Sequence, residues 1–217
     1  LLSPQLSQQF APSDIVVAGV PFDSGTAITA LRTDLLKEAG LTVADFTDIT
    51  WSEYIEKGED VLAKTGKPLT SGMAGSADLI MMMLQSAGAS LFDDEGNPTI
   101  AGNEALIKSI ETYQQLVESG VFVEVNSWDE FIGTFVNSNV AGVMQGVWIM
   151  GSIQSAEDQA GKWGIANLPK LDDVDGATHY SANGGSSWAI SANADQELAA
   201  DFLAKTFGGT DGYKYIN

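Results

Sequence analysis

Four short stretches of the chain combine small, polar and aromatic residues at positions where a strand is expected to end or a helix to begin. They are PFDSGT (21–26), GMAGSAD (72–78), QGVWIMG (145–151) and ANGGSSW (182–188). In α/β proteins, ligands bind outside the carboxyl ends of the strands. Asp and Ser could bond hydroxyl groups there and an aromatic ring could cover an apolar ligand face, which favours a neutral polar ligand such as a carbohydrate. Each stretch taken alone is also typical of an ordinary turn.

Trp148 has the most unusual position of the five tryptophans. It follows the apolar stretch VAGVMQ (140–145) and Gly146, where the chain should turn into a helix. We expect its indole to be at least partly exposed toward a cleft, and the alternative is a core tryptophan that anchors the following helix. The other tryptophans lie within or at the ends of expected elements and are expected to be mostly structural: Trp51, Trp128, Trp163 and Trp188.

The residue types needed for catalysis form no recognisable constellation. His179 is the single histidine and lies in a polar loop, no G-x-S-x-G motif occurs, and the chain has no cysteine. The chain has 29 Asp and Glu residues, so pairs of carboxylates will occur by chance. A hydrolase that uses two carboxylates therefore stays an alternative.

Metal and cofactor motifs are incomplete as well. DDEGN (93–97) and DDVDG (172–176) resemble pieces of calcium loops, but neither has the ligand spacing and distal Glu of an EF-hand. Both are more typical of Asp/Gly turns. The sequence contains no G-x-G-x-x-G or G-K-[ST] phosphate cradle, and we expect no cofactor and no metal.

The composition limits the classes of partner. A formal net charge of −19, with only ten Lys and Arg, argues against nucleic acid and anionic membranes, because both would repel the chain. With 44% hydrophobic residues, the 217-residue chain can form a sizeable core. No stretch approaches the ~20 apolar residues of a membrane span. The opening LLSPQLSQQF has neither an initiator Met nor a basic leader, so we expect a fragment or a processed chain.

Expected strands and helices alternate along the chain, which predicts an α/β fold with a mainly parallel sheet flanked by helices. Helix starts are marked by capping boxes and by single N-cap residues. The boxes are Thr50 with Glu53, Ser127 with Glu130 and Asn193 with Gln196, and the single caps are Ser76 and Asn103. Strands are expected at 14–20, 26–32, 67–73, 140–145, 163–169 and 186–191, and helices at 34–40, 54–66, 77–88, 104–120, 128–137, after Trp148 and at 196–207.

Taken in order, six stretches resemble the extracellular solute-binding proteins of carbohydrate ABC importers, of the maltose-binding type. They are VPFDSGTAITALRTDLLKEAGL, ITWSEYIEKGEDVLAKTGKPL, MLQSAGASLFDDEGNPTI, FVNSNVAGVMQGVWIMGSI, WGIANLPK and NGGSSWAISANADQELAADFLAK. The similarity covers nearly the whole chain. Its most specific pieces are AGVMQGVW (141–148) and GGSSWAIS followed by ELAADFLAK.

The resemblance implies that Trp148 is a platform on which a sugar ring stacks. It also implies ligand contacts from a segment that crosses between two lobes, from a loop and helix start that contribute hydrogen bonds, and from a glycine pair where the backbone approaches the sugar. These further ligand-binding residues are Asp23, Ser24, Ser76, Asp78, Gly184, Gly185 and Ser186. The family's aromatic residue followed by Asn is absent from ITALRTD (28–34), so one expected platform is missing.

The resemblance also implies a domain organisation. Family members have two α/β lobes joined by crossing segments, with the sugar held between them. Residues 1–217 would then form one periplasmic-binding-protein-like lobe, mainly the second, plus segments near 14–30 and 184–191 that cross to a missing lobe. The family's first stretch and the part after YKYIN are absent, so the isolated chain is expected to hold half of a site and to bind sugars weakly.

The implied function is binding rather than catalysis. The protein would capture a sugar or oligosaccharide outside the cytoplasmic membrane and deliver it to ABC permease subunits after its lobes close. It would be extracellular or periplasmic, membrane-anchored as a lipoprotein in its full-length form, and a monomer. The alternatives are a carbohydrate-active hydrolase and an adhesion or scaffold domain without a ligand.

Overall fold

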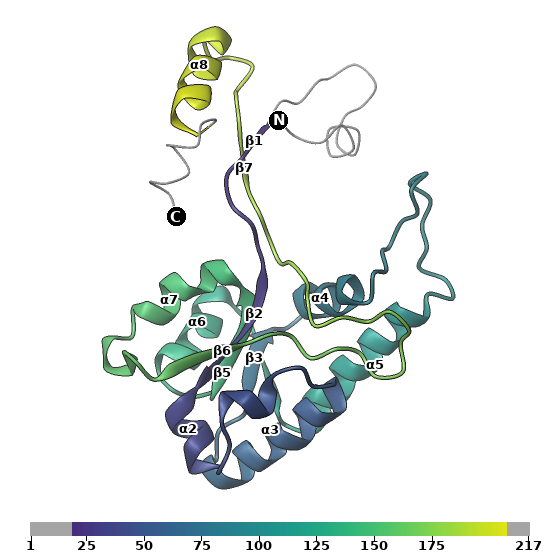
Figure 1. The fold of residues 1–217 in the computed structure, drawn as a ribbon, viewed down its shortest axis with the longest axis vertical. Coiled ribbons are helices and arrows are strands. Elements are labelled where there is room, and N and C mark those ends of the chain that lie inside the picture. The colour runs from purple at the N-terminus through teal and green to yellow at the C-terminus, as the bar shows by residue number, and fades with distance from the viewer. Residues whose placement is uncertain (1–18, 208–217) are drawn as a thin grey trace. The chain divides into compact units, whose positions relative to one another are not determined.

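The computed structural model describes residues 19–207, which fall into two compact units. Thr26–Asn183 form the main unit, and Leu1–Gly25 with Gly184–Asn217 form the terminal unit. Figure 1 shows the chain entering the main unit before β2 and leaving it after β6. These passages coincide with the segments near 14–30 and 184–191, and the assignment of the chain to one lobe stays a prediction. No helix within the described residues is long and apolar enough to cross a membrane.

Two small sheets form the centre of the main unit. In the first, β2 (Ala27–Arg32) lies between β5 (Gly142–Gly146) and β6 (Trp163–Ala166), and both neighbours run antiparallel to it. In the second, β3 (Thr70–Met73) pairs in parallel with β4 (Phe122–Val125).

The structure confirms the α/β class, but the expectation of mainly parallel pairing is wrong for the described strands. β5 and β6 do run in the same direction, as expected for two strands joined through a helix. β2 separates them and runs the opposite way. It follows β1 without an intervening helix, so no helical crossover sets its direction. The strand at 26–32 and the helical connection from β5 to β6 were therefore predicted correctly, but the antiparallel place of β2 between β5 and β6 was not.

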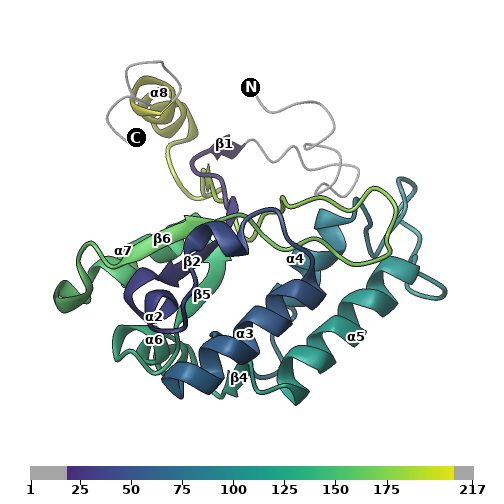
Figure 2. The ribbon, with the colours of Figure 1, turned by 60° about the horizontal axis from the view of Figure 1, so that its bottom comes forward.

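Helices cover both faces of these sheets (Figure 2), and α3 packs beside α5. The helices and 3-10 turns of the main unit are α2 (Thr33–Glu38), η1 (Val43–Phe46), α3 (Trp51–Thr65), α4 (Asp78–Ser86), α5 (Glu104–Glu118), α6 (Trp128–Val136), η2 (Val147–Ile149), α7 (Met150–Gln154) and η3 (Glu157–Gln159).

The six residues of β2 are all buried, and they alternate between two hydrophobic cores. Ala27 and Leu31 belong to a core that also contains apolar residues of α2, α3, α4 and α5. Ile28 and Ala30 belong to a second core with residues of α6 and α7. β2 therefore joins the two cores of the main unit, and its neighbour β5 does so too, since Met144 lies in the first core and Val143 in the second.

Arg32 ends β2 as a buried charge with a full set of partners. Its Nε and Nη2 donate to the Asp34 carboxylate at 2.9 and 2.8 Å, and its Nη1 donates to Ser138 Oγ at 2.7 Å. The hydrogen bonds from Arg32 hold the pKa of Asp34 below its usual value, although burial opposes this. The stability contributed by the pair is present above the ordinary pKa of an Asp and is lost as the pH falls through the lowered one.

Most of the predicted helix starts are confirmed. Thr50 Oγ1 accepts from Glu53 N and the Glu53 carboxylate accepts from Thr50 N, which completes the capping box. Asn103 caps α5 by accepting from Leu106 N at 3.1 Å. Ser127 caps α6, but the return bond from Glu130 goes to the backbone N–H of Asn126.

Two predicted caps are wrong. Ala77 is the N-cap of α4, and the hydroxyl of Ser76 instead accepts from Asp78 N at 3.2 Å, as in a Ser turn that precedes the helix. Asp195 rather than Asn193 caps α8, because its carboxylate accepts from Leu198 N at 3.0 Å.

The described part of the terminal unit, residues 19–25 and 184–207, contains one antiparallel strand pair and one helix. β1 (Gly19–Pro21) pairs with β7 (Ser187–Ala189), and α8 spans Gln196–Thr206. The predicted strand at 14–20 lies largely outside the described residues. Phe22, Trp188 and Phe207 form a ring cluster in this unit, with centroids 5.4 to 5.9 Å apart.

Two helical glycines, Gly58 and Gly151, give a matched test of the packing of α3 in the main unit. An added Cβ at Gly58 in α3 would fall on Val121 Cγ1 and lie 3.2 Å from Leu69 Cδ2, whereas at Gly151 in α7 it would meet no described atom within 4 Å. Gly58→Ala should lower the free energy of unfolding by about 1–3 kcal/mol through overpacking. Gly151→Ala should raise it by about 0.5–1 kcal/mol, because Ala is the better helix former. Urea unfolding followed by circular dichroism measures both, and equal effects would contradict the packing of α3.

Candidate ligand-binding pocket

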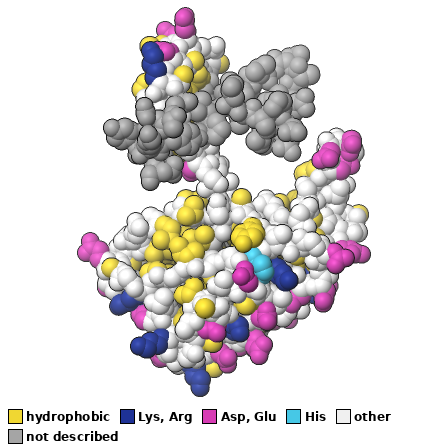
Figure 3. Space-filling model, in the orientation of Figure 1, with side chains coloured by type: hydrophobic (Ala, Val, Ile, Leu, Met, Phe, Trp, Pro, Cys, Tyr) yellow, Lys and Arg dark blue, Asp and Glu magenta, His cyan; other side chains and the backbone are white. Residues whose placement is uncertain are grey.

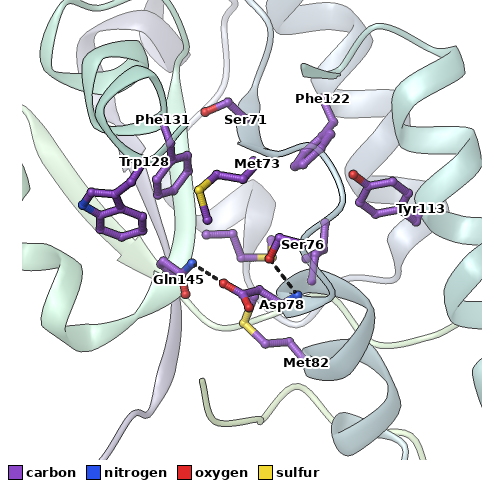
Figure 4. A pocket seen from close by; sticks show the side chains of 13 residues that line it. Ser71, Met73, Ser76, Asp78, Met82, Tyr113, Phe122, Trp128, Phe131 and Gln145 are labelled. Carbon is purple, nitrogen blue, oxygen red and sulfur yellow. Dashed lines mark hydrogen bonds between the residues drawn. The ribbon is translucent and has the colours of Figure 1, made fainter. Parts of the chain in front are cut away.

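The main unit contains a pocket where β3, β5 and the starts of α4 and α6 meet (Figure 4). Aromatic, thioether and polar side chains line it together. The lining residues are Ser71, Gly72, Met73, Ser76, Asp78, Leu79, Met82, Tyr113, Phe122, Trp128, Phe131, Met144 and Gln145.

Two pairs of aromatic rings form much of the pocket wall. Trp128 and Phe131, one turn apart on α6, have ring centroids 5.3 Å apart. Tyr113 of α5 and Phe122 of β4 meet edge to face at 5.5 Å. Such a wall suits a ligand with apolar faces, because Trp128, which is 41% exposed, offers a large rigid surface at little entropic cost, while Phe131 and Phe122 are buried.

Tyr113 remains a neutral phenol at ordinary pH. Burial raises the pKa of Tyr113, and the neighbouring Glu124 raises it further. The phenol donates to Glu124 Oε1 at 2.6 Å. Its proton is therefore committed to Glu124, and its oxygen is left as an acceptor.

Asp78 provides the charge of the pocket. It is the first residue of α4, where the helix dipole favours a carboxylate. Gln145 Nε2 donates to Asp78 Oδ2 at 3.1 Å, as Figure 4 shows. Of the described residues that line the pocket, Asp78 is the single carboxylate. Elsewhere acidic side chains are spread over the surface, as on the face drawn in Figure 3.

The other end of the Gln145 side chain is held by two donors. Its Oε1 accepts from the backbone N–H of Gly146 at 3.1 Å and from Nδ2 of Asn183. Gln145 itself is only 5% exposed. The pocket therefore contains a buried amide whose two ends are both engaged.

Trp148 lies beside this pocket, in η2 between β5 and α7. Its side chain is 41% exposed, as expected from the sequence, and its ring is 5.8 Å from that of Trp128 at an angle of 34°. The indole Nε1 donates to Asn183 O at 2.8 Å. The indole folds back over Gly146, where an added Cβ would fall on the ring nitrogen and on Asn183 O. A glycine is thus required at position 146, because the Trp148 indole and Asn183 O leave no room for a Cβ atom.

The predicted site residues separate into two groups. Ser76 and Asp78 line the pocket of the main unit, with Trp148 next to it. Asp23 and Ser186 meet in the terminal unit, where Asp23 Oδ1 accepts from the Ser186 hydroxyl at 2.6 Å and from its backbone N–H.

Ser24 precedes Gly25 in the same loop as Asp23. Gly184 and Gly185 have φ values of 94° and 108°, which only glycine adopts freely. The two segments of the terminal unit that carry predicted site residues are thus linked by the hydrogen bonds between Asp23 and Ser186. Their role in binding a ligand stays a prediction.

Sequence reasoning missed several pocket residues. Trp128 was expected to be mostly structural, but it is 41% exposed and lines the pocket. Gln145 was predicted as the end of a strand and the start of the QGVWIMG stretch, but it was not singled out as a site residue. A buried strand that ends in an amide followed by glycine was the available signal, since a buried amide needs partners.

The loop motifs behave as turns. Asp93 Oδ1 accepts from the backbone N–H of Glu95 and Asn97, which makes DDEGN an Asx-type turn. His179 Nδ1 lies 3.0 Å from Leu168 O. Within residues 19–207, no group of three or more His, Asp or Glu side chains is placed to hold a metal ion.

The sequence matches the family described as bacterial extracellular solute-binding protein over residues 2–207. The lactose-binding protein of Rhizobium radiobacter is 40% identical over 192 residues, which cover 88% of this chain and 45% of that protein. The arabinooligosaccharide-binding protein of Halalkalibacterium halodurans is 27% identical over 193 residues, covering 86% and 42%. The chain therefore spans less than half the length of these curated relatives.

Solved structures share the fold. The GacH receptor of Streptomyces glaucescens, solved unliganded and with acarbose, superposes with a TM-score of 0.76 at 17% identity and covers 99% of this chain and 54% of that one. The binding protein of B. animalis subsp. lactis Bl-04 in complex with β-1,6-galactobiose gives 0.76 at 22% identity, with 97% and 52% covered. The fold is thus that of the periplasmic binding proteins.

Gly146→Ala tests the close approach beneath Trp148. The φ of −60° and ψ of 151° at Gly146 are open to alanine, so the effect is steric. The indole should be displaced from Asn183 O, and the free energy of unfolding should fall by about 1–3 kcal/mol. Hydrogen exchange of the Trp148 indole N–H, followed by NMR, should become faster. Gly151→Ala serves as the control, and unchanged exchange in Gly146→Ala would contradict the proposed contact.

Proposed function

The chain belongs to the family of bacterial extracellular solute-binding proteins, and we propose that it takes part in capturing a sugar or oligosaccharide for an ABC importer. The captured sugar is delivered to permease subunits of the importer. This role is proposed for the whole protein, since the chain spans only part of the length of its relatives.

The pocket of the main unit is the observation that carries the proposal. A sugar ring has apolar C–H faces and a rim of hydroxyl groups. The exposed ring of Trp128, which packs against the buried Phe131, matches the faces, while the carboxylate of Asp78 accepts hydroxyl protons. Hydrogen bonds to a charged group are stronger than those between neutral groups, so Asp78 gives the site its directional contact.

The named ligands of the relatives support a neutral saccharide. One relative is called a lactose-binding protein, the other an arabinooligosaccharide-binding protein, and one structural neighbour holds β-1,6-galactobiose. We therefore propose a di- or oligosaccharide, with lactose as the first candidate because its binding protein has the higher sequence identity of the two.

Two sets of residues are proposed to contact the sugar. In the main unit, Trp148 stacks on a sugar ring, while Asp78 and Ser76 bond its hydroxyls. In the terminal unit, the Asp23–Ser186 pair and the neighbouring residues contribute polar and backbone contacts: Ser24, Gly184 and Gly185. The exposed face of Trp148 and the pocket position of Asp78 support the first set.

We propose that the protein binds a sugar and does not turn it over. A hydrolase would need two carboxylates flanking the scissile bond, and the described lining of the pocket supplies Asp78 alone. Incubating the full-length protein with lactose and following glucose release tests this alternative. Sustained release would replace the binding role with an enzymatic one. We further propose an extracellular or periplasmic location, a lipoprotein anchor and a monomeric state.

Isothermal titration calorimetry of the natural full-length chain tests the proposal. The panel contains lactose, β-1,6-galactobiose, maltose and an arabinobiose, with galacturonic acid as an anionic comparison. We expect saturable binding of at least one neutral sugar and none of the acid, because Asp78 would repel a second carboxylate. Failure of every neutral sugar in the panel would contradict the proposed ligand class.

Trp148→Ala should weaken binding of the best sugar by about tenfold or more, since a lost aromatic stacking contact is worth about 1–3 kcal/mol by analogy with stacked bases. Because Trp148 is already 41% exposed, the melting temperature should change little. Phe92→Ala is the matched control, since Phe92 is also an exposed aromatic residue but does not line the pocket. A large loss of stability with intact sugar binding would show that Trp148 is a structural residue.

A further inference from the structure

We propose that Gln145 is a positioning residue that fixes both polar and aromatic parts of the site, Asp78 directly and Trp148 through Asn183. This inference rests on the proposed sugar-binding function. Gln145 is buried, at 5% exposure, so its role is to hold other groups rather than to offer a broad surface to a ligand. The groups it holds belong to α4, to η2 and to the last residue of the main unit.

The hydrogen bonds allow only one orientation of the Gln145 amide. Both groups at Oε1 are donors, the backbone N–H of Gly146 and the Asn183 amide nitrogen. The group at Nε2 is the Asp78 carboxylate, which only accepts when ionised. A flipped amide would oppose an NH₂ group to two donors and an oxygen to a carboxylate. The amide is therefore locked, and its N–H fixes the position of Asp78 Oδ2.

The Gln145 amide also supports Trp148 indirectly, through Asn183. Asn183 donates its side-chain N–H to Gln145 and accepts the Trp148 indole N–H on its backbone oxygen at 2.8 Å. Restraining Asn183 therefore restrains the acceptor that holds the indole. Gln145 itself is held on β5, which pairs with β2 at the register Ile28↔Gln145. The two proposed ligand-contacting residues, Asp78 and Trp148, are thus held in position relative to β2 through Gln145.

This arrangement determines what each group offers to a sugar. The indole N–H of Trp148 is committed to Asn183, so the ring offers its face and not a hydrogen bond. Asp78 has one oxygen engaged by Gln145 and keeps acceptor capacity for hydroxyl protons. Gln145 thereby sets where the accepting oxygen points, which decides which hydroxyl of the sugar can reach it.

Two substitutions separate the hydrogen bond of Gln145 to Asp78 from its hydrogen bonds to Gly146 and Asn183. Gln145→Leu removes both, so sugar affinity should fall by about tenfold or more and the Trp148 indole N–H should exchange faster. Gln145→Glu keeps an oxygen for Gly146 and Asn183 but places a carboxylate against Asp78. Its indole exchange should stay slow while its affinity at about pH 8 falls.

The Gln145→Glu variant has a pH signature that loss of structure would not produce. Two carboxylates within hydrogen-bonding distance share a proton as the pH is lowered. Once protonated, the introduced carboxyl group can donate to Asp78 as the amide did. Affinity of Gln145→Glu should therefore recover between about pH 8 and about pH 5, while that of the natural protein should change less over this range.

Gln159 supplies the matched control. It is 1% exposed, its Nε2 donates to Phe135 O and Val136 O, and its Oε1 accepts the indole N–H of Trp163 at 3.0 Å. Gln159→Leu therefore removes a buried amide with comparable bonds away from the pocket. It should lower the melting temperature as Gln145→Leu does, yet leave sugar affinity unchanged.

Calorimetry with the neutral sugar bound best by the natural full-length chain, together with NMR of the Trp148 indole, gives distinct outcomes. Lower affinity and faster exchange in Gln145→Leu, with neither in Gln159→Leu, support the proposal. Unchanged affinity and exchange in Gln145→Leu overturn it. If the natural chain binds no sugar in the panel, the proposed function fails, and indole exchange alone then decides the positioning role: faster exchange in Gln145→Leu supports it and unchanged exchange overturns it.

Discussion

The burial of β2 on both faces is the constraint on which the main unit depends. Its six residues are all buried, so the strand needs a hydrophobic partner on each side and hydrogen-bonded strands on each edge. β5 and β6 supply the edges, and the two cores supply the faces. At its end, the buried Arg32 is compensated by Asp34 and Ser138. The two cores of the unit are therefore joined along β2 and along its neighbour β5, whose Val143 and Met144 also lie in different cores.

The pocket draws its opposing parts from these two cores. Asp78 begins α4, whose Leu79 and Met82 belong to the first core. Trp128 and Trp148 lie on elements anchored by Phe131 and Ile149, which belong to the second. Gln145 on β5 connects the two sides by its hydrogen bonds. These hydrogen bonds therefore connect groups that are positioned by separate sets of apolar contacts.

Local signals predicted much of the fold but less of the site. The capping box at Thr50 was readable because it depends on residues three apart, and the exposure of Trp148 followed from the glycine before it. Tertiary contacts decided the rest. On α5, residue hydrophobicity does not mark the buried face, since Ile110 is exposed and small residues such as Ser109 and Thr112 are buried instead.

The roles of the pocket residues that the sequence did not reveal depend on partners in other elements. Gln145 meets Asp78 across 67 residues of chain, and Trp128 lies against Trp148 of η2. Neither contact leaves a trace in local spacing, because each arises only when the sheets and helices have packed. A periodic pattern can place a side chain on a face of its own element, but it cannot name the group opposite.

The chain of hydrogen bonds from Asp78 to Trp148 affects how a ligand would be recognised. Asp78, Gln145, Asn183 and Trp148 are bonded to one another within the protein, so little side-chain ordering remains to oppose binding. In the proposed function, the aromatic faces accept any sugar ring with a flat apolar face, because stacking makes no hydrogen bond to a particular hydroxyl group. In that function, discrimination is assigned to Asp78, whose fixed oxygen favours a hydroxyl at one position and is left unpaired beneath a ligand that lacks it. In the proposed function, affinity thus comes mainly from the rings, and selectivity from a carboxylate held in place by an amide.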